Sequence, residues 1–154
     1  MENIARTPIG EVKARAPVRV HLRAPLIDAV TLLRERRRGA VIIEDDDGRI
    51  VGIFTERDLI TRVDHDDHRW HTRPVEDHMT RAPQTIPQTG TVADAVRLMR
   101  SGTFRHLPII DGDGRVVGIL SIRDILAHIA EHYPKEFLNL PPDPEHEAHS
   151  RWGG

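Results

Sequence analysis

Two short segments of the sequence each place a hydroxyl and a carboxylate three residues apart. Thr55 precedes Asp58 in the string GIFTERD at 52–58, and Ser121 precedes Asp124 in GILSIRD at 118–124. Residues i and i+3 share one face of a helix. A carboxylate can accept both hydroxyl hydrogens of a ribose diol, and the free N–H groups of a helix N-terminus favour a phosphate. The pattern therefore suits a nucleotide, and it equally suits a structural role as helix N-cap and first-turn acid.

The two segments belong to a repeat that organises most of the chain. IEDDDGRIVGIFTERDLI at 43–60 aligns without a gap to IIDGDGRVVGILSIRDIL at 109–126, at an offset of 66 residues (109 − 43). The same offset relates the strings DAV at 28–30 and 94–96, and RAP at 15–17 and 81–83. Two copies of one unit are therefore predicted. The division is a lead-in at 1–8, units at 9–63 and 75–133, a linker at 64–74 and a largely disordered tail at 134–154.

Each copy has the periodicity of a helix, a hairpin and a second helix. Apolar residues have helical spacing over 26–33 and 92–99. β-Branched runs at 41–43 and 107–110 are followed by the acidic turns DDDG and DGDG and by further apolar runs at 50–54 and 116–120, which predicts two hairpins. A further helix is expected to begin at Thr55 and at Ser121. The predicted fold class is α+β.

Composition restricts the class of function. The chain has 154 residues, 22 basic and 24 acidic side chains and a formal net charge of −2, which suits one compact domain and does not favour nucleic acid as a partner. It has no cysteine, which excludes disulfides and thiolate zinc sites and leaves the redox compartment open. Its first residues are charged and its apolar runs are short, so a cytoplasmic protein without a membrane partner is expected. The motifs GxSxG, HExxH and GxxxxGK[ST] are absent from the sequence, so we expect neither an enzyme nor a catalytic cofactor.

Two other clusters carry weaker signals. His65, His68 and His71 recur at spacings of three, but they lie in an Asp-rich segment without a firm helix, so no metal site is predicted. Four arginines, at 34 and 36–38, lie at the C-terminal end of the first predicted helix. Cations at that end offset the helix dipole, so a solvated helix end is favoured over a nucleic-acid site.

The repeat resembles a known family, the paired CBS domain or Bateman module, which is named after cystathionine β-synthase. The resemblance covers residues 9–129 and rests on IGEVKARAPVRVHLRAPLIDAV, on VEDHMTRAPQTIPQTGTVADAVRLMRSGTFRHLPII and on the two repeated strings above. It implies a pseudo-twofold pair of β-α-β-β-α CBS units with small facing sheets and helices outside. It also implies two clefts between the units, which hold adenine nucleotides in many relatives.

By this resemblance, each cleft combines the hydroxyl-x-x-Asp segment of one unit with the leading segment and second strand of the other. The first cleft would be lined by Ile53, Thr55, Arg57, Asp58, Thr80, Gln84, Phe104, Arg105 and His106. The second would be lined by Ala14, Val18, Arg38, Gly39, Ala40, Ile119, Ser121, Arg123 and Asp124. Arg57 and Arg123 lie between hydroxyl and acid, where they either approach phosphate or pair with neighbouring carboxylates.

The two clefts differ in the charge expected of them. Arg105 and His106 offer a guanidinium fork and an imidazole to a phosphate beside the first cleft. The matching Gly39 and Ala40 offer no charge to the second. The first cleft is therefore the favoured site.

The sequence thus favours a non-catalytic regulatory module. It would sense an adenosine-containing ligand, AMP, ADP or ATP, and relay binding to an unidentified regulated protein by shifting the orientation of its units. The family resemblance also implies a homodimer formed through the helices. The alternative is a ligand-free scaffold or oligomerisation adaptor in which Asp58 and Asp124 act only as helix-start acids. A metal- or nucleic-acid-responsive regulator is a third hypothesis.

Overall fold

Each repeat folds into a short strand, a helix, a hairpin and a second helix. The first repeat forms β1 (Arg19–His21), α2 (Leu26–Glu35), β2 (Ala40–Glu44), β3 (Ile50–Thr55) and α3 (Glu56–Thr61). The second forms β5 (Ile86–Pro87), α4 (Val92–Gly102), β6 (His106–Ile110), β7 (Val116–Ser121) and α5 (Ile122–His132). Around them lie α1 (Glu2–Ala5), η1 (Ile9–Glu11), η2 (Trp70–Thr72), η3 (Val75–Asp77), β4 (Thr80–Arg81) and α6 (Pro134–Leu138).

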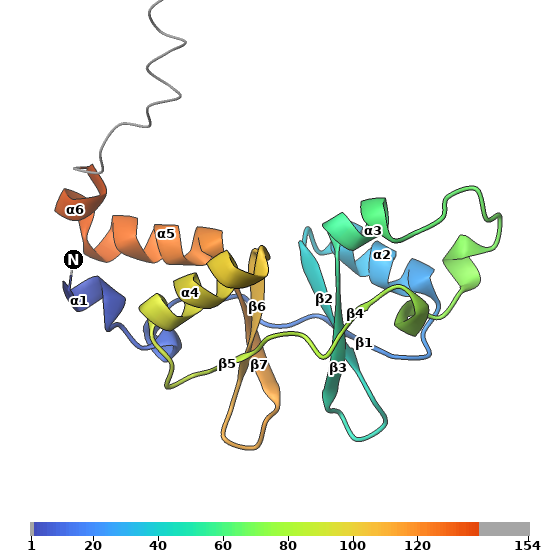
Figure 1. The fold of residues 1–154 in the computed structure, drawn as a ribbon, viewed down its shortest axis with the longest axis horizontal. Coiled ribbons are helices and arrows are strands. Elements are labelled where there is room, and N and C mark those ends of the chain that lie inside the picture. The colour runs from blue at the N-terminus through green and yellow to red at the C-terminus, as the bar shows by residue number, and fades with distance from the viewer. Residues whose placement is uncertain (1, 139–154) are drawn as a thin grey trace, which may run out of the picture.

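The computed structural model describes residues 2–138 (Figure 1). The tail predicted at 134–154 therefore begins with helix α6, and its remaining part lies outside the described residues. Within 2–138, every helix is too short or too polar to span a membrane.

The two hairpins turn where the acidic strings predict. Gly48 and Gly114 adopt φ of 73° and 78°, a region that glycine enters without steric cost. In the first turn, Oδ1 of Asp45 accepts hydrogen bonds from the backbone N–H groups of Asp47 and Arg49, both at 2.9 Å. Asp111 accepts the equivalent bonds in the second turn. The acids of DDDG and DGDG thus stabilise the turns themselves.

The strands form two small sheets that face each other, with the helices on their outer sides (Figure 1). The order is β1-β2-β3-β4 in one sheet and β5-β6-β7 in the other. The strand that follows the linker, β4, pairs antiparallel with β3 and so belongs to the first sheet. Ala40, Ile42 and Ile53 of the first sheet meet Val116 and Ile119 of the second in one buried apolar cluster. Its burial holds the two sheets together.

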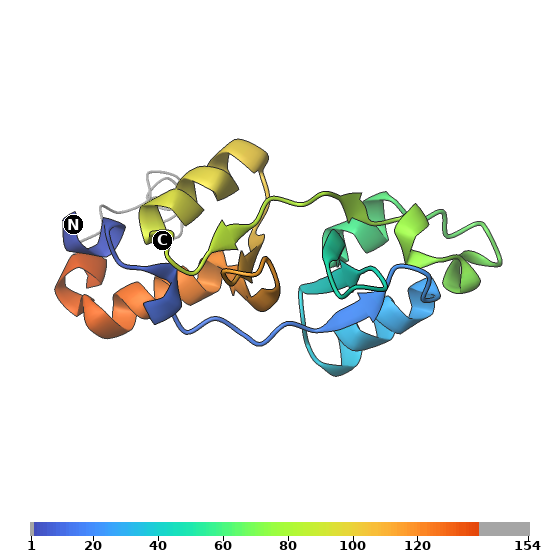
Figure 2. The ribbon, with the colours of Figure 1, turned by 90° about the horizontal axis from the view of Figure 1, so that it is seen from below.

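Two structural bodies result, and the chain crosses between them twice (Figure 2). The segment that leads into the first strand of each repeat is buried in the opposite body. Ile4 and Ile9 lie in the core under α4 and α5, and Val75 lies in the core under α2. Leu26 N–H donates to Arg73 O at 2.7 Å, and Val92 N–H donates to Thr7 O at 2.9 Å. These two bonds are related by the offset of 66 (73 − 7 and 92 − 26). The lead-in predicted at 1–8 is therefore part of the second body.

Candidate functional site

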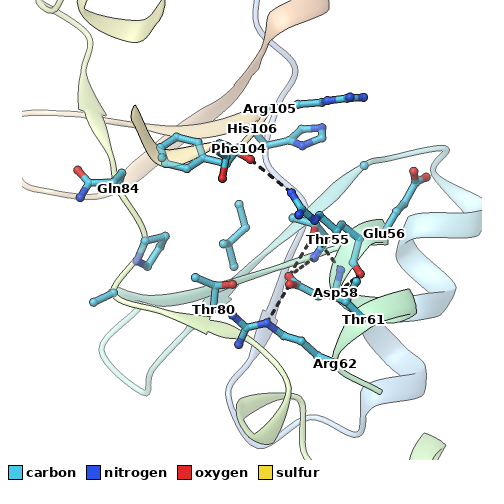
Figure 3. Close-up of a pocket in the computed structure, with 17 residues that line it drawn as sticks. Thr55, Glu56, Asp58, Thr61, Arg62, Thr80, Gln84, Phe104, Arg105 and His106 are labelled. Carbon is cyan, nitrogen blue, oxygen red and sulfur yellow. Dashed lines mark hydrogen bonds and ion pairs between the residues drawn. The ribbon is translucent and has the colours of Figure 1, made fainter. Parts of the chain in front are cut away.

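The larger of two cavities lies between the bodies and has a volume of about 860 Å³. Its walls come from β3 and α3 of the first body, from the crossing segment at 80–84, and from the turn between α4 and β6 (Figure 3). All nine residues predicted for the first cleft line it: Ile53, Thr55, Arg57, Asp58, Thr80, Gln84, Phe104, Arg105 and His106. The sequence prediction missed eight further lining residues, which are Gly39, Glu56, Thr61, Arg62, Ala82, Pro83, Gly102 and Thr103.

At the floor of this cleft, Thr55 and Asp58 form a capping box at the start of α3. Thr55 N–H donates to Asp58 Oδ2 at 2.9 Å, and Asp58 N–H donates to Thr55 Oγ1 at 3.2 Å. The second carboxylate oxygen, Oδ1, pairs with Arg62 Nε at 3.2 Å (Figure 3). Both oxygens of this buried carboxylate therefore have protein partners, and a ribose diol would have to share Oδ1 with Arg62.

The same device recurs at a helix start outside both cavities. Thr91 N–H donates to Asp94 Oδ2 at 3.0 Å, and Asp94 N–H donates to Thr91 Oγ1 at 3.2 Å. The bonds from Thr91 hold the pKa of Asp94 below its ordinary value. Neither residue lines the first cleft or the second. The hydroxyl-x-x-Asp pattern thus forms a helix cap at Thr55, Thr91 and Ser121, and a ligand role depends on where the cap is placed.

The second cavity, of about 330 Å³, lies on the other side of the junction between the bodies. Seven of the residues predicted for the second cleft line it: Arg38, Gly39, Ala40, Ile119, Ser121, Arg123 and Asp124. Ala14 and Val18 do not, because their side chains pack against the two opposite cores. Arg15, between them in sequence, lines the cavity instead.

The two cavities meet at a junction formed by Gly39, Glu56, Arg105 and His106, which line both. From the sequence, Arg105 and His106 are assigned to the first cleft alone. No basic side chain is expected at the equivalent positions of the second cleft. A Cβ on Gly39 would lie 2.7 Å from His106 Cε1, so the imidazole occupies the space that glycine leaves. Burial lowers the pKa of His106, and Glu56 and Asp124 partly oppose that shift.

The linker histidines do not converge on one point. His65 and His71 each place their ring against Trp70, with centroids 5.8 Å apart in both pairs. In the part of the chain that the structure describes, no three histidine, aspartate or glutamate side chains are grouped as a metal ion would need.

The fold and the site together define a pair of duplicated α+β units, with facing sheets and two clefts between them. The CBS domain family profile matches this chain twice, at residues 9–65 and 75–131. The chain therefore belongs to the CBS-domain family, as its sequence indicates, and carries two CBS domains.

Two relatives of known sequence match most of this chain. An uncharacterized 17.7 kDa protein of Acidianus ambivalens is 32% identical over 131 residues, which cover 85% of this chain and 78% of that protein. Inosine-5'-monophosphate dehydrogenase of Mycobacterium tuberculosis is 32% identical over 127 residues. That match covers 82% of this chain and only 22% of the dehydrogenase.

Solved structures confirm the predicted fold class. A CBS-domain containing protein from Agrobacterium tumefaciens is 31% identical, with a TM-score of 0.71 over 82% of this chain and 96% of that one. CBSX2, solved in complex with AMP, is 25% identical, with a TM-score of 0.70 over 81% of this chain and 97% of that one.

Proposed function

We propose that this protein is a non-catalytic regulatory module that binds an adenine nucleotide in the first cleft. The observation that carries the proposal is the cavity of about 860 Å³ whose walls come from both bodies. Its volume falls within the range of about 300–1,000 Å³ typical of small-molecule sites. The similarity to CBSX2, a protein solved in complex with AMP, supports the same ligand class.

The chemistry of the walls suits the parts of a nucleotide. Ile53 and the half-buried Phe104 offer apolar surface to a base. Asp58 offers a carboxylate to a ribose diol, and Arg105 and His106 offer donors to a phosphate. A bound nucleotide would thus contact β3 and α3 of one body and the α4–β6 turn of the other.

Contact with both bodies provides a route for regulation. A ligand shifts the relative orientation of the two bodies only by as much as it binds one arrangement better than another. The element that changes would be the apolar contact between the sheets, where Ile42 and Ile53 meet Val116. A regulated protein would then recognise one of the two arrangements.

The test is titration calorimetry with AMP, ADP and ATP on the wild type, Asp58→Ala and Asp94→Ala. Both substitutions remove the N3 acid of a capping box and leave the N-cap backbone N–H without its carboxylate partner. Only Asp58 lines a cavity. We expect Asp58→Ala to abolish nucleotide binding and Asp94→Ala to leave it unchanged. Equal affinities in the two variants would contradict a ligand role for Asp58.

The alternative function, a ligand-free scaffold, is favoured by one observation. The capping box at Thr91–Asp94 shows that this pattern also caps a helix whose first residues line neither the first cavity nor the second. A scaffold predicts no change in melting temperature with any adenine nucleotide at millimolar concentration, because only binding to the folded state raises it.

We further propose that the chain forms a homodimer through α3 and α5. Ile60 is 77% exposed and Leu126 is 45% exposed, and the two positions are equivalent in the repeat (126 − 60 = 66). Two equivalent exposed apolar side chains, one on the helix that follows each hairpin, fit a self-complementary interface. Sedimentation analysis should find a dimer for the wild type and a monomer for Ile60→Glu. A dimer that persists in Ile60→Glu and in Leu126→Glu would place the interface elsewhere.

A further inference from the structure

The second cavity is the more strongly basic of the two. Guanidinium groups surround it, from Arg15, Arg37, Arg38, Arg105 and Arg123, and His106 lies at its edge. The acidic residues in its lining are Glu56 and Asp124. The sequence comparison of Gly39 with Arg105 could not show this charge, because the arginines come from four separate segments that meet only in the fold.

None of these five arginines forms an ion pair within residues 2–138. Arg15 donates instead to the backbone carbonyl of Arg37, from Nη1 at 2.9 Å, and Arg38 donates to the carbonyl of Ala16. Only 9% of Arg38 is exposed. Its burial and the nearby Arg15 both lower its pKa, and Asp124 partly opposes them. Like charges held this close, one of them buried, repel each other, and Asp124 compensates that repulsion only in part.

Asp124 differs from Asp58 in what its carboxylate contacts. Its Oδ2 accepts the capping bond from Ser121 N–H at 2.8 Å, as in the first cleft. The position equivalent to Arg62 holds His128 (128 − 62 = 66), and no ion pair is formed by Asp124 in the part of the chain described. The positive charge of the arginines in the second cavity is thus neutralised less by carboxylates than the charge of Arg62, which pairs with Asp58.

The second cavity lacks the features that suit a nucleoside. The position equivalent to Phe104 is Arg38, so a base would meet a guanidinium rather than an aromatic ring (104 − 38 = 66). Its volume of about 330 Å³ is well below the 860 Å³ of the first. Guanidinium forks bind phosphate oxygens in pairs, so the chemistry present is that of a polyanion site.

The two cavities adjoin each other at Gly39, Glu56, Arg105 and His106, which line both. We propose that the second cleft is a polyphosphate subsite. A nucleoside di- or triphosphate would lie with its nucleoside in the first cleft and its terminal phosphates among these arginines, one nucleotide per chain. The nucleoside half of this proposal rests on the function proposed above, and the polyphosphate half does not.

The test uses three probes in titration calorimetry: AMP, ATP and inorganic tripolyphosphate. Arg123→Gln and Arg15→Gln remove cations of the second cavity. Arg100→Gln removes the same charge from the exposed end of α4 and lines neither cavity, so it is the matched control. The Arg123 side chain forms no hydrogen bond or ion pair within the described residues, so its variant should unfold at the same urea concentration as the wild type.

We expect ATP to bind the wild type at least about tenfold more tightly than AMP, because charge-assisted bonds add to its affinity. Arg123→Gln and Arg15→Gln should remove most of that difference and leave AMP binding unchanged. Arg100→Gln should retain it. One ATP should bind per chain, and tripolyphosphate should compete with ATP.

Other outcomes overturn the proposal or separate its two halves. Equal affinity for AMP and ATP, two ATP molecules per chain, or an ATP affinity insensitive to both cavity variants would each overturn it. Tripolyphosphate that binds wild type and both cavity variants equally would overturn the subsite. Tripolyphosphate that binds wild type but not the cavity variants, with no nucleotide binding at all, would support the subsite and refute the proposed nucleotide function instead.

Discussion

Gly52 and Gly118 occupy equivalent positions in the two hairpins (118 − 52 = 66), yet their surroundings differ. A Cβ on Gly52 would overlap Met79 Sδ and would lie 2.8 Å from Met79 Cγ and 3.0 Å from the Thr80 carbonyl oxygen. A Cβ on Gly118 would meet the Arg15 carbonyl oxygen and Ile109 Cδ1, both at 3.4 Å, which is ordinary contact. Alanine should therefore be costly at 52 and tolerated at 118.

The magnitude follows from two opposing effects. Overpacking a buried site costs about 1–3 kcal/mol, and replacing glycine by alanine returns about 0.4–1 kcal/mol by restricting the unfolded chain. The Met79 side chain can move, but the Thr80 carbonyl belongs to β4, which pairs with β3. We expect Gly52→Ala to destabilise the fold by about 1–2 kcal/mol and Gly118→Ala to be neutral or slightly stabilising.

Urea denaturation followed by circular dichroism measures both changes, provided that the slope with denaturant is unchanged. Because β4 carries Thr80 into the first cleft, Gly52→Ala should also weaken nucleotide binding there. Equal midpoints for the two alanine variants would refute the reasoning, since it rests on the difference between Met79–Thr80 and the residues facing Gly118.

Two further residues give testable predictions. Burial lowers the pKa of His106 from 6.5, so the unfolded chain binds the proton more readily and stability should fall as the pH drops below about 6.5. His106→Gln should flatten that limb of a denaturation series. A phosphate beside His106 should raise its pKa, so nucleotide binding near pH 6 should take up protons, which calorimetry in buffers of different ionisation enthalpy detects. Thr103 adopts φ of 55° after α4, so Thr103→Gly should raise stability by about 1 kcal/mol, read from the melting temperature.

Hydrophobic periodicity predicted the helices and hairpins because each spans enough residues to show a period. The two- and three-residue strands β1, β4 and β5 are too short to show one. The exchange of leading segments was missed for another reason. Pro8-Ile9 and Pro74-Val75 repeat at the offset of 66, but no local sequence pattern indicates which body buries Ile9 or Val75.

The lining of the first cleft was predictable by family resemblance, because its residues lie at the ends of strands that the repeat places. The second was predicted less well. The backbone at 14–18 crosses between the bodies, and the side chain that reaches the cavity is Arg15 rather than Ala14 or Val18. Arg37 lines the cavity from a left-handed conformation, with φ of 50°, that the arginine run does not indicate. Such details depend on the path of the backbone.

The duplication separates the structural role of a residue from its chemical role. The capping boxes of Thr55 and Ser121 are retained at the offset of 66, whereas that of Thr91 is not, because Pro25 occupies the equivalent position. The copies also differ at the clefts, where Phe104 lines the first cavity and Arg38, at the equivalent position, lines the second. Equivalent helix caps therefore support two unequal sites. The difference in charge, rather than the shared hydroxyl and acid, is what would let one cleft take a nucleoside and the other a phosphate chain.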